Sequence, residues 1–211
     1  RIETLPKFNK PLVWTLHDLW PFTGGCSYNK GCENFKDSCG DCPQLLSGKS
    51  DDLSRRVWQR KVKAWAHLNL TIVATSARMA DCARASSLFR HLRIETIPLG
   101  LDLDKYKPID RHFARELLNL PQDKQLVLFG AVNATSDPRK GFDLLLPALE
   151  QISRSGWQDQ LELVVFGSSQ PEQPIDLGFK THYLGFMHDD ISLALVYAAA
   201  DVMVVPSTQE A

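Results

Sequence analysis

Short apolar runs alternate with amphipathic segments along most of the chain. The runs are rich in Val, Ile, Leu and Phe, as buried strands are, and lie at 12–16, 71–74, 92–98, 125–130, 161–167, 181–185 and 202–205. Helical segments are predicted between them, at 52–68, 76–86, 111–119, 142–153 and 190–200. This alternation predicts βαβ units, and therefore an α/β fold with parallel sheets and helices on both faces.

One stretch breaks the alternation and divides the chain. Residues 102–110 combine mixed charges with Pro108, which is typical of a connection between domains. We therefore predict two Rossmann-like parallel-sheet domains, at 1–101 and 121–211, joined by a linker and helix at 102–120. Because the chain opens without Met and stops just after an apolar run, we interpret it as an internal segment and expect both domains to be incomplete.

Pro147 conflicts with the helical pattern around it. It lies inside the predicted helix 142–153, where proline costs about 3 kcal/mol beyond the first turn. We expect a late helix start or a kink there.

Polar residues gather where the predicted strands end. His17 and Asp18 follow the first strand, residues 130–141 follow the fourth, and Ser207 to Glu210 follow the last. Ligands of parallel sheets bind at the carboxyl ends of the strands, so these segments are candidates for a binding site. For His17 two interpretations are open: a polar ligand contact with Asp18 as its orienting partner, or a structural histidine.

The segment 130–141 carries two cations, Arg139 and Lys140, at the mouth of a predicted helix. Backbone N–H groups, the positive end of the helix dipole and these side chains together suit a phosphate or diphosphate. The segment lacks the Gly-x-x-x-x-Gly-Lys-Ser/Thr pattern of NTPases and the Gly-x-Gly-x-x-Gly pattern of dinucleotide sites. The alternative is that both side chains are solvated loop cations.

A long irregular loop at 20–47 contains four cysteines in the pattern C-x5-C-x6-C-x2-C: Cys26, Cys32, Cys39 and Cys42. The last pair has the spacing with which two thiolates meet one zinc ion, whereas the first pair is spaced more widely than in ordinary zinc fingers. A structural zinc site, disulfides and free thiols all stay open, with zinc the leading alternative. Cys82 is predicted to be a small buried residue on a helix.

The composition and charge of the chain exclude some classes of binding partner. The 211 residues include 24 Lys and Arg and 25 Asp and Glu, a formal net charge of -1, which excludes the overall positive field of a dedicated nucleic-acid binder. No apolar run approaches the roughly 18 residues that span a bilayer. A basic cluster lies on the helix from Asp52, and we interpret it as a solvated face, with an anionic-membrane contact as the alternative; it comprises Arg55, Arg56, Arg60, Lys61 and Lys63.

Three sets of motifs together resemble the GT-B glycosyltransferases of family 4. Residues 97–102 (IPLGLD) resemble the family's IPNGVD segment, and 129–130 (FG) with 139–142 (RKGF) resemble its donor-phosphate region. The third set, 183–186 (YLGF), 197–202 (YAAADV), 205–207 (VPS) and Glu210, resembles its LG…YAAADV…PS…E stretch. The segment 15–20 (TLHDLW) with the cysteine loop resembles a subgroup of bacterial cell-surface polysaccharide transferases.

The resemblance implies a reaction and its substrates. It implies retaining transfer of a sugar from a nucleotide-sugar donor, with UDP or GDP, to a glycan or lipid-linked acceptor in cell-surface polysaccharide synthesis. Residues 121–211 would bind the donor and residues 1–101 the acceptor. The cytoplasm, at or near the inner face of the membrane, is the expected location. Catalysis would need no metal, because fixed cations stabilise the leaving diphosphate.

The resemblance also assigns site residues. His17 and Glu210 are the expected catalytic residues, and the donor contacts are Gly130, Arg139, Lys140, Gly141 and Ser207. The chain departs from the family in having Ala131 after the glycine, where an arginine is usual, and Leu99 in place of Asn. The second Glu of the E-x7-E motif lies beyond Ala211, so we expect the segment alone to be inactive.

Two other functions stay open from the sequence. A GT-B sugar-nucleotide epimerase would share the nucleotide site but would need a carboxylate acid and base facing the sugar, and the sequence identifies no such pair. A non-catalytic interaction module built around a zinc loop would bind no nucleotide-sugar.

Overall fold

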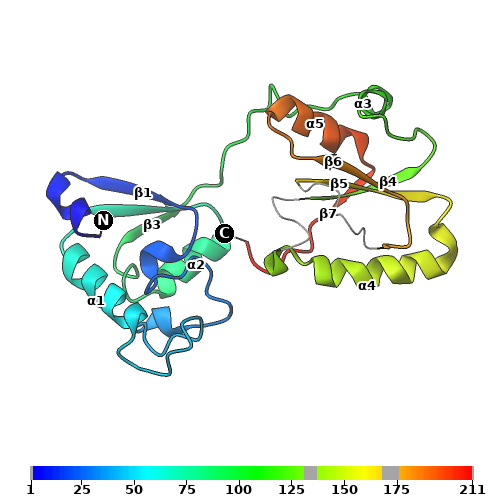
Figure 1. The fold of residues 1–211 in the computed structure, drawn as a ribbon. Helices are drawn as coiled ribbons and strands as arrows, with labels where there is room; N and C mark the ends of the chain where they lie inside the picture. Colours follow the sequence, from blue (N-terminus) through cyan, green and yellow to red (C-terminus); the bar gives the residue numbers. More distant parts are fainter. Residues whose placement is uncertain (1, 131–136, 168–175, 211) are drawn as a thin grey trace. The chain divides into compact units, whose positions relative to one another are not determined.

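The computed structural model describes residues 2–130, 137–167 and 176–210, and the chain divides into two compact units after Gly100. We call residues 2–100 the N-terminal unit and residues 101–210 the C-terminal unit. Each has its own parallel sheet with helical crossovers (Figure 1). The predicted α/β class with two Rossmann-like parallel sheets is confirmed.

The N-terminal unit contains a three-stranded sheet in the order β1-β2-β3. The strands are β1 (Leu12–Leu16), β2 (Leu70–Ala74) and β3 (Arg93–Thr96), and the helices α1 (Leu53–Trp65) and α2 (Ala77–Ala85) connect them. Three short 3-10 helices lie at Ile2–Phe8, Trp20–Phe22 and Asn34–Lys36. The 12–16 run was expected to be a buried strand, but Val13 is 72% exposed because side chains alternate between the two faces of a strand.

Asp52 fixes the start of α1. Its Oδ1 accepts hydrogen bonds from the Arg55 amide at 3.1 Å and from the Ser54 hydroxyl at 2.6 Å, as an N-cap aspartate does. Burial alone would raise the pKa of Asp52, but hydrogen bonds from Ser54, Cys42 and Arg55 outweigh it and lower the pKa. Ser54 is buried beside the cap, whereas Leu53 is 63% exposed.

Lys61 contradicts the predicted solvated face of α1. Its side chain is fully buried, and its ammonium donates to the carbonyl oxygens of Trp20 and Thr23, the latter at 2.9 Å. It also lies 3.7 Å from the centre of the Trp20 ring. Burial lowers the pKa of Lys61 to about 8. Lys61 therefore ties the start of the cysteine loop to α1, while Arg56, Arg60 and Lys63 are exposed.

The C-terminal unit contains a four-stranded parallel sheet in the order β6-β5-β4-β7. Its strands are β4 (Gln125–Gly130), β5 (Leu161–Phe166), β6 (Thr181–Gly185) and β7 (Val202–Val204), and its helices are α3 (Arg111–Leu117), α4 (Phe142–Ile152) and α5 (Asp190–Ala199). A 3-10 turn at Pro138–Lys140 precedes α4, and a π-helical turn at Ser153–Trp157 follows it.

Helices cover both faces of this sheet. One face packs on α4 through Phe142, Leu145 and Leu149, and the opposite face packs on α3 and α5 through Ala114 and Val196 (Figure 1). β5 is therefore buried along its whole length. α4 begins at Phe142, ahead of Pro147, so the expected late start is wrong. Among the described residues, no helix is long and apolar enough to cross a membrane.

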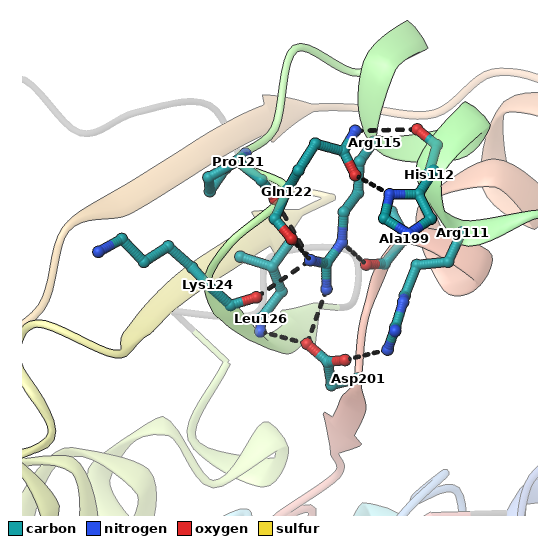
Figure 2. A network of polar contacts seen from close by, with 9 residues as sticks. All are labelled: Arg111, His112, Arg115, Pro121, Gln122, Lys124, Leu126, Ala199 and Asp201. Atoms are coloured by element: carbon teal, nitrogen blue, oxygen red, sulfur yellow. Dashed lines mark hydrogen bonds and ion pairs between the residues drawn. The ribbon is translucent and has the colours of Figure 1, made fainter.

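A network of polar contacts links α3, β4 and the start of β7 in the C-terminal unit (Figure 2). Arg115, which is 2% exposed, donates to Asp201 Oδ2 at 2.7 Å and to the carbonyl oxygens of Pro121, Gln122, Lys124 and Ala199. Asp201 also accepts from the Leu126 amide at 2.7 Å and from Arg111 at 2.5 Å. The buried Arg115 guanidinium therefore has a carboxylate partner and further acceptors, which is the condition for tolerating a buried charge.

Candidate functional site

Two segments far apart in the sequence meet beyond the carboxyl ends of β4 and β7. Lys140, at the end of the 3-10 turn, donates to Glu210 Oε1 at 2.7 Å. The Thr208 amide donates to the Arg139 carbonyl at 2.9 Å. We call residues 137–141 with 206–210 the 140–210 site. It brings together four of the expected donor contacts, Arg139, Lys140, Gly141 and Ser207, with Glu210, one of the two expected catalytic residues.

Gly141 makes this approach possible. Its φ is 71°, in the left-handed region that favours glycine, and a Cβ there would lie 2.1 Å from the carbonyl oxygen of Pro206. Any other residue would therefore push the two segments apart. Gly130 has a similar role at the end of β4, where a Cβ would lie 2.3 Å from the Phe166 ring.

Charges within the 140–210 site are paired. Burial alone would raise the pKa of Glu210, but hydrogen bonds from Lys140 and Ser207 outweigh it and lower the pKa. Arg139 forms an ion pair with Asp137 at 2.5 Å, and the hydrogen bond from Arg139 lowers the pKa of Asp137. The side chain of Lys140 is 21% exposed, so an incoming anion can reach the ammonium beside the N-terminus of α4. Asp137 is a site residue that the sequence prediction missed, although its place before Pro138 is typical of a helix cap.

The rest of the predicted phosphate loop, 131–136, lies outside the described residues. This segment includes Ala131, where the resembling family has an arginine. The positions on either side of it, Gly130 and Asp137, are described above.

His17 is exposed at the end of β1 in the N-terminal unit. Within the described chain, its side chain takes part in no hydrogen bond with Asp18, because Asp18 Oδ1 accepts from the Trp20 amide at 2.8 Å. In this structure Asp18 binds the backbone at the start of the Trp20–Phe22 turn, and its role in orienting His17 stays a prediction. An exposed imidazole is available to a ligand, which favours the ligand-contact interpretation over the structural one.

The four cysteines of the 20–47 loop line one cavity of about 30 Å³. No disulfide joins them. Among the described residues, no three His, Cys, Asp or Glu side chains are gathered tightly enough to hold a metal ion. Burial raises the pKa of Cys39 to about 11 and also raises that of Cys26, so these thiols are protonated at neutral pH and are poor nucleophiles.

The sequence of the C-terminal unit matches a known family. Residues 123–211 match the family described as "Glycosyl transferases group 1". The Escherichia coli K12 protein WcaC, named for glycosyl transfer in colanic acid biosynthesis, is 52% identical over 42 residues, covering 18% of this chain and 10% of WcaC. D-inositol 3-phosphate glycosyltransferase 2 of Catenulispora acidiphila is 33% identical over 132 residues, covering 56% of this chain and 30% of that protein.

Similarity in fold extends over nearly the whole chain. Sucrose-phosphate synthase of Thermosynechococcus elongatus superposes on 97% of this chain and 46% of its own, with a TM-score of 0.63 and 24% identity. The chain therefore has the GT-B fold, and residues 123–211 are similar in sequence to the group 1 glycosyl transferases. The matched regions cover less than half of each of these three proteins. The family match contains the whole 140–210 site.

Proposed function

We propose that this chain belongs to a retaining glycosyltransferase that moves a sugar from a nucleotide-sugar donor to a glycan or lipid-linked acceptor. The observation that carries the proposal is the Lys140–Glu210 pair, which forms where Gly141 allows the two segments to touch. It places a cation, a carboxylate and a helix N-terminus together at the end of a parallel sheet. The cation and the helix N-terminus suit a diphosphate, and the carboxylate suits the hydroxyl groups of the attached sugar.

The cations act on the leaving group. Lys140 holds the donor diphosphate, and Arg139 adds a second positive charge from the same turn. As the bond between the sugar and the diphosphate breaks, negative charge grows on the phosphate oxygens, and the ammonium stabilises it. These fixed charges supply what a divalent metal supplies elsewhere, so we propose transfer without a catalytic metal.

The remaining residues position the sugar. Once the donor has displaced the Glu210 carboxylate from Lys140, Glu210 accepts hydrogen bonds from the hydroxyl groups of the sugar. The Ser207 hydroxyl donates to them. Gly130 and Gly141 keep the backbone close to the donor. His17 contributes a polar contact to the reacting sugar, and the N-terminal unit binds the acceptor.

We place the acceptor in cell-surface polysaccharide synthesis. The supporting observation is the 52% identity to WcaC, which is named for colanic acid biosynthesis. The donor nucleotide, UDP or GDP, belongs to the cytoplasm, and a lipid-linked acceptor would bring the enzyme to the inner face of the membrane.

Lys140→Ala in the full-length enzyme tests the donor site. Losing a charge-assisted bond to a buried phosphate costs about 1.5–3 kcal/mol, so affinity for the nucleotide-sugar, measured by calorimetry, should fall about 10- to 150-fold. Lys105→Ala is the matched control, because Lys105 forms an exposed ion pair of similar length, 2.8 Å to Asp190, in the same unit.

Unchanged donor affinity and transfer rate in Lys140→Ala would reject the proposed donor site. A panel of UDP-, GDP- and ADP-sugars, scored for hydrolysis and transfer products, identifies the nucleotide. The anomeric configuration of the product, determined by NMR, tests retention directly.

A further inference from the structure

Four thiols converge on one small space in the N-terminal unit. Cys26, Cys32, Cys39 and Cys42 all line the cavity of about 30 Å³, which has room for about one water molecule or one ion. They are the only cysteines in the 20–47 loop, and the fifth, Cys82, lies apart on α2. The loop folds so that residues up to 16 positions apart face the same space.

Backbone interactions hold the Cys39–Cys42 turn in place. Gly40 has a φ of 146°, and a Cβ there would lie 2.4 Å from the Ser50 carbonyl oxygen. The Cys42 amide donates to Asp52 Oδ2 at 2.8 Å, which anchors the turn to the cap of α1. The Gly24 amide donates to the Cys39 sulfur at 3.0 Å. Such N–H···S bonds favour the thiolate over the thiol and lower the cost of collecting negative charge.

The charge of Lys61 also needs a counterpart. Its buried ammonium reaches two carbonyl oxygens and an aromatic ring, and it forms no ion pair in the described structure. Lys61 binds the Thr23 carbonyl oxygen, and the next residue, Gly24, donates to the Cys39 sulfur, so the ammonium lies close to the cysteine cavity. If Cys39 and Cys26 ionise on binding a metal, their charges favour the protonated form of Lys61 more than Asp18 does. A zinc ion with four thiolates carries a net charge of about -2, which compensates a buried cation where neutral thiols do not.

We propose that Cys26, Cys32, Cys39 and Cys42 bind one zinc ion and that Lys61 is the buried counter-charge of this site. The sulfur atoms stand around the cavity without yet forming a tight set, so binding draws them inward and releases the thiol protons. The bound ion cross-links a loop that Phe22 and Phe35 already anchor in the core of the N-terminal unit. It has a structural role and does not depend on the proposed donor site.

Metal content of the purified full-length protein tests the site. Protein prepared without chelator should contain about one zinc per chain, and replacement by Co²⁺ should give the intense visible absorption of tetrahedral thiolate coordination. Cys32→Ser and Cys39→Ser should lose the metal and this spectrum. Cys82→Ser, the matched control, should keep both. Cys32 is only half-buried, so its variant is informative even if Cys39→Ser fails to fold.

Lys61→Gln tests the counter-charge. Zinc affinity, measured by competition with a chromophoric chelator, should fall about tenfold or more, as it does when groups around metal ligands are lost. Lys63→Gln, on the exposed side of α1, should bind zinc normally. Equal affinity in Lys61→Gln and wild type would overturn the role of Lys61.

Two results would overturn the site itself. One is metal-free protein in which all five thiols react freely with a thiol reagent in the native state. The other is paired sulfurs, detected as thiols that react only after reduction. Neither result bears on donor binding, so the two proposals fail independently.

Discussion

The two units each bury one cation completely, and they satisfy it in different ways. Arg115 in the C-terminal unit has five acceptors, of which one is the carboxylate of Asp201 (Figure 2). Lys61 in the N-terminal unit has two carbonyl oxygens and the Trp20 ring. The guanidinium keeps its charge at every accessible pH, whereas burial lowers the pKa of Lys61 to about 8.

The charge of Arg115 is already balanced by the carboxylate of Asp201. The charge of Lys61 is bound only by neutral groups, so it needs a further anion. Removing one member of a buried ion pair leaves the other charge uncompensated and is costly. In metal-free protein, removing Lys61, which has no carboxylate partner in the described structure, leaves only neutral carbonyl groups without a donor. The two sites should therefore respond unequally to the same type of substitution.

Arg115→Met should have the largest effect. It leaves Asp201 without its buried partner and four carbonyl groups without a donor, so we expect a loss of about 3–5 kcal/mol in the free energy of unfolding. Urea unfolding followed by circular dichroism measures the loss. Arg111→Met, which removes the 54% exposed partner of Asp201, should cost no more than about 1 kcal/mol; equal losses would contradict a special role for Arg115.

In metal-free protein, Lys61→Met should have a smaller effect, about 1–3 kcal/mol in the free energy of unfolding, because two carbonyl oxygens lose a donor but no anion is left without its partner. Four of the five tryptophans, at 14, 20, 58 and 65, lie in the N-terminal unit, so tryptophan fluorescence follows its unfolding. Lys63→Met should unfold as wild type does. A loss as large as that of Arg115→Met would remove the distinction between the two cations.

Acid should weaken the C-terminal network gradually. Burial alone would raise the pKa of Asp201, but hydrogen bonds from the Leu126 amide and Arg115 outweigh it and lower the pKa. Because the folded-state pKa lies below the unfolded value, the stabilisation is complete above the unfolded pKa, near 4, and is lost as pH falls through the folded pKa.

Asp201→Asn isolates this contribution. The difference in unfolding free energy between wild type and Asp201→Asn should be constant near neutral pH and shrink below about pH 4. A difference that grows on acidification would have the wrong sign and would exclude a depressed pKa at Asp201.

Local patterns were sufficient to predict the elements of the fold. The runs at 12–16, 125–130 and 181–185 have the same bounds as β1, β4 and β6, because apolar content and flanking turns act over a few residues. The buried cations were beyond such patterns. The partners of Lys61 lie 38 and 41 residues away in the sequence, so a local pattern shows only another charge on a basic helix.

The candidate site also combines residues that the sequence singled out with contacts that it could not predict. Resemblance to a family singled out Lys140 and Glu210, and position at strand ends singled out His17. The ion pair between residues 70 apart depends on three-dimensional geometry, whereas the hydrogen bond from the Trp20 amide to the Asp18 carboxylate is a local contact. Asp137 was missed because Arg139 was considered only as a contact for phosphate or as a solvated cation. Its role as the ion-pair partner of a carboxylate two residues away was not considered.

The position of Asp201 has a consequence for how the chain folds during synthesis. Its partners Arg115 and Leu126 lie 86 and 75 residues earlier, so these contacts have high sequence separation and form slowly. Until the ribosome has released the segment around Asp201, Arg115 has no carboxylate, and β4 lacks its neighbour β7. The N-terminal unit, whose described strands end at Thr96, can fold first, and the contacts of Arg115 and β4 in the C-terminal unit are completed only when Asp201 and β7 are available.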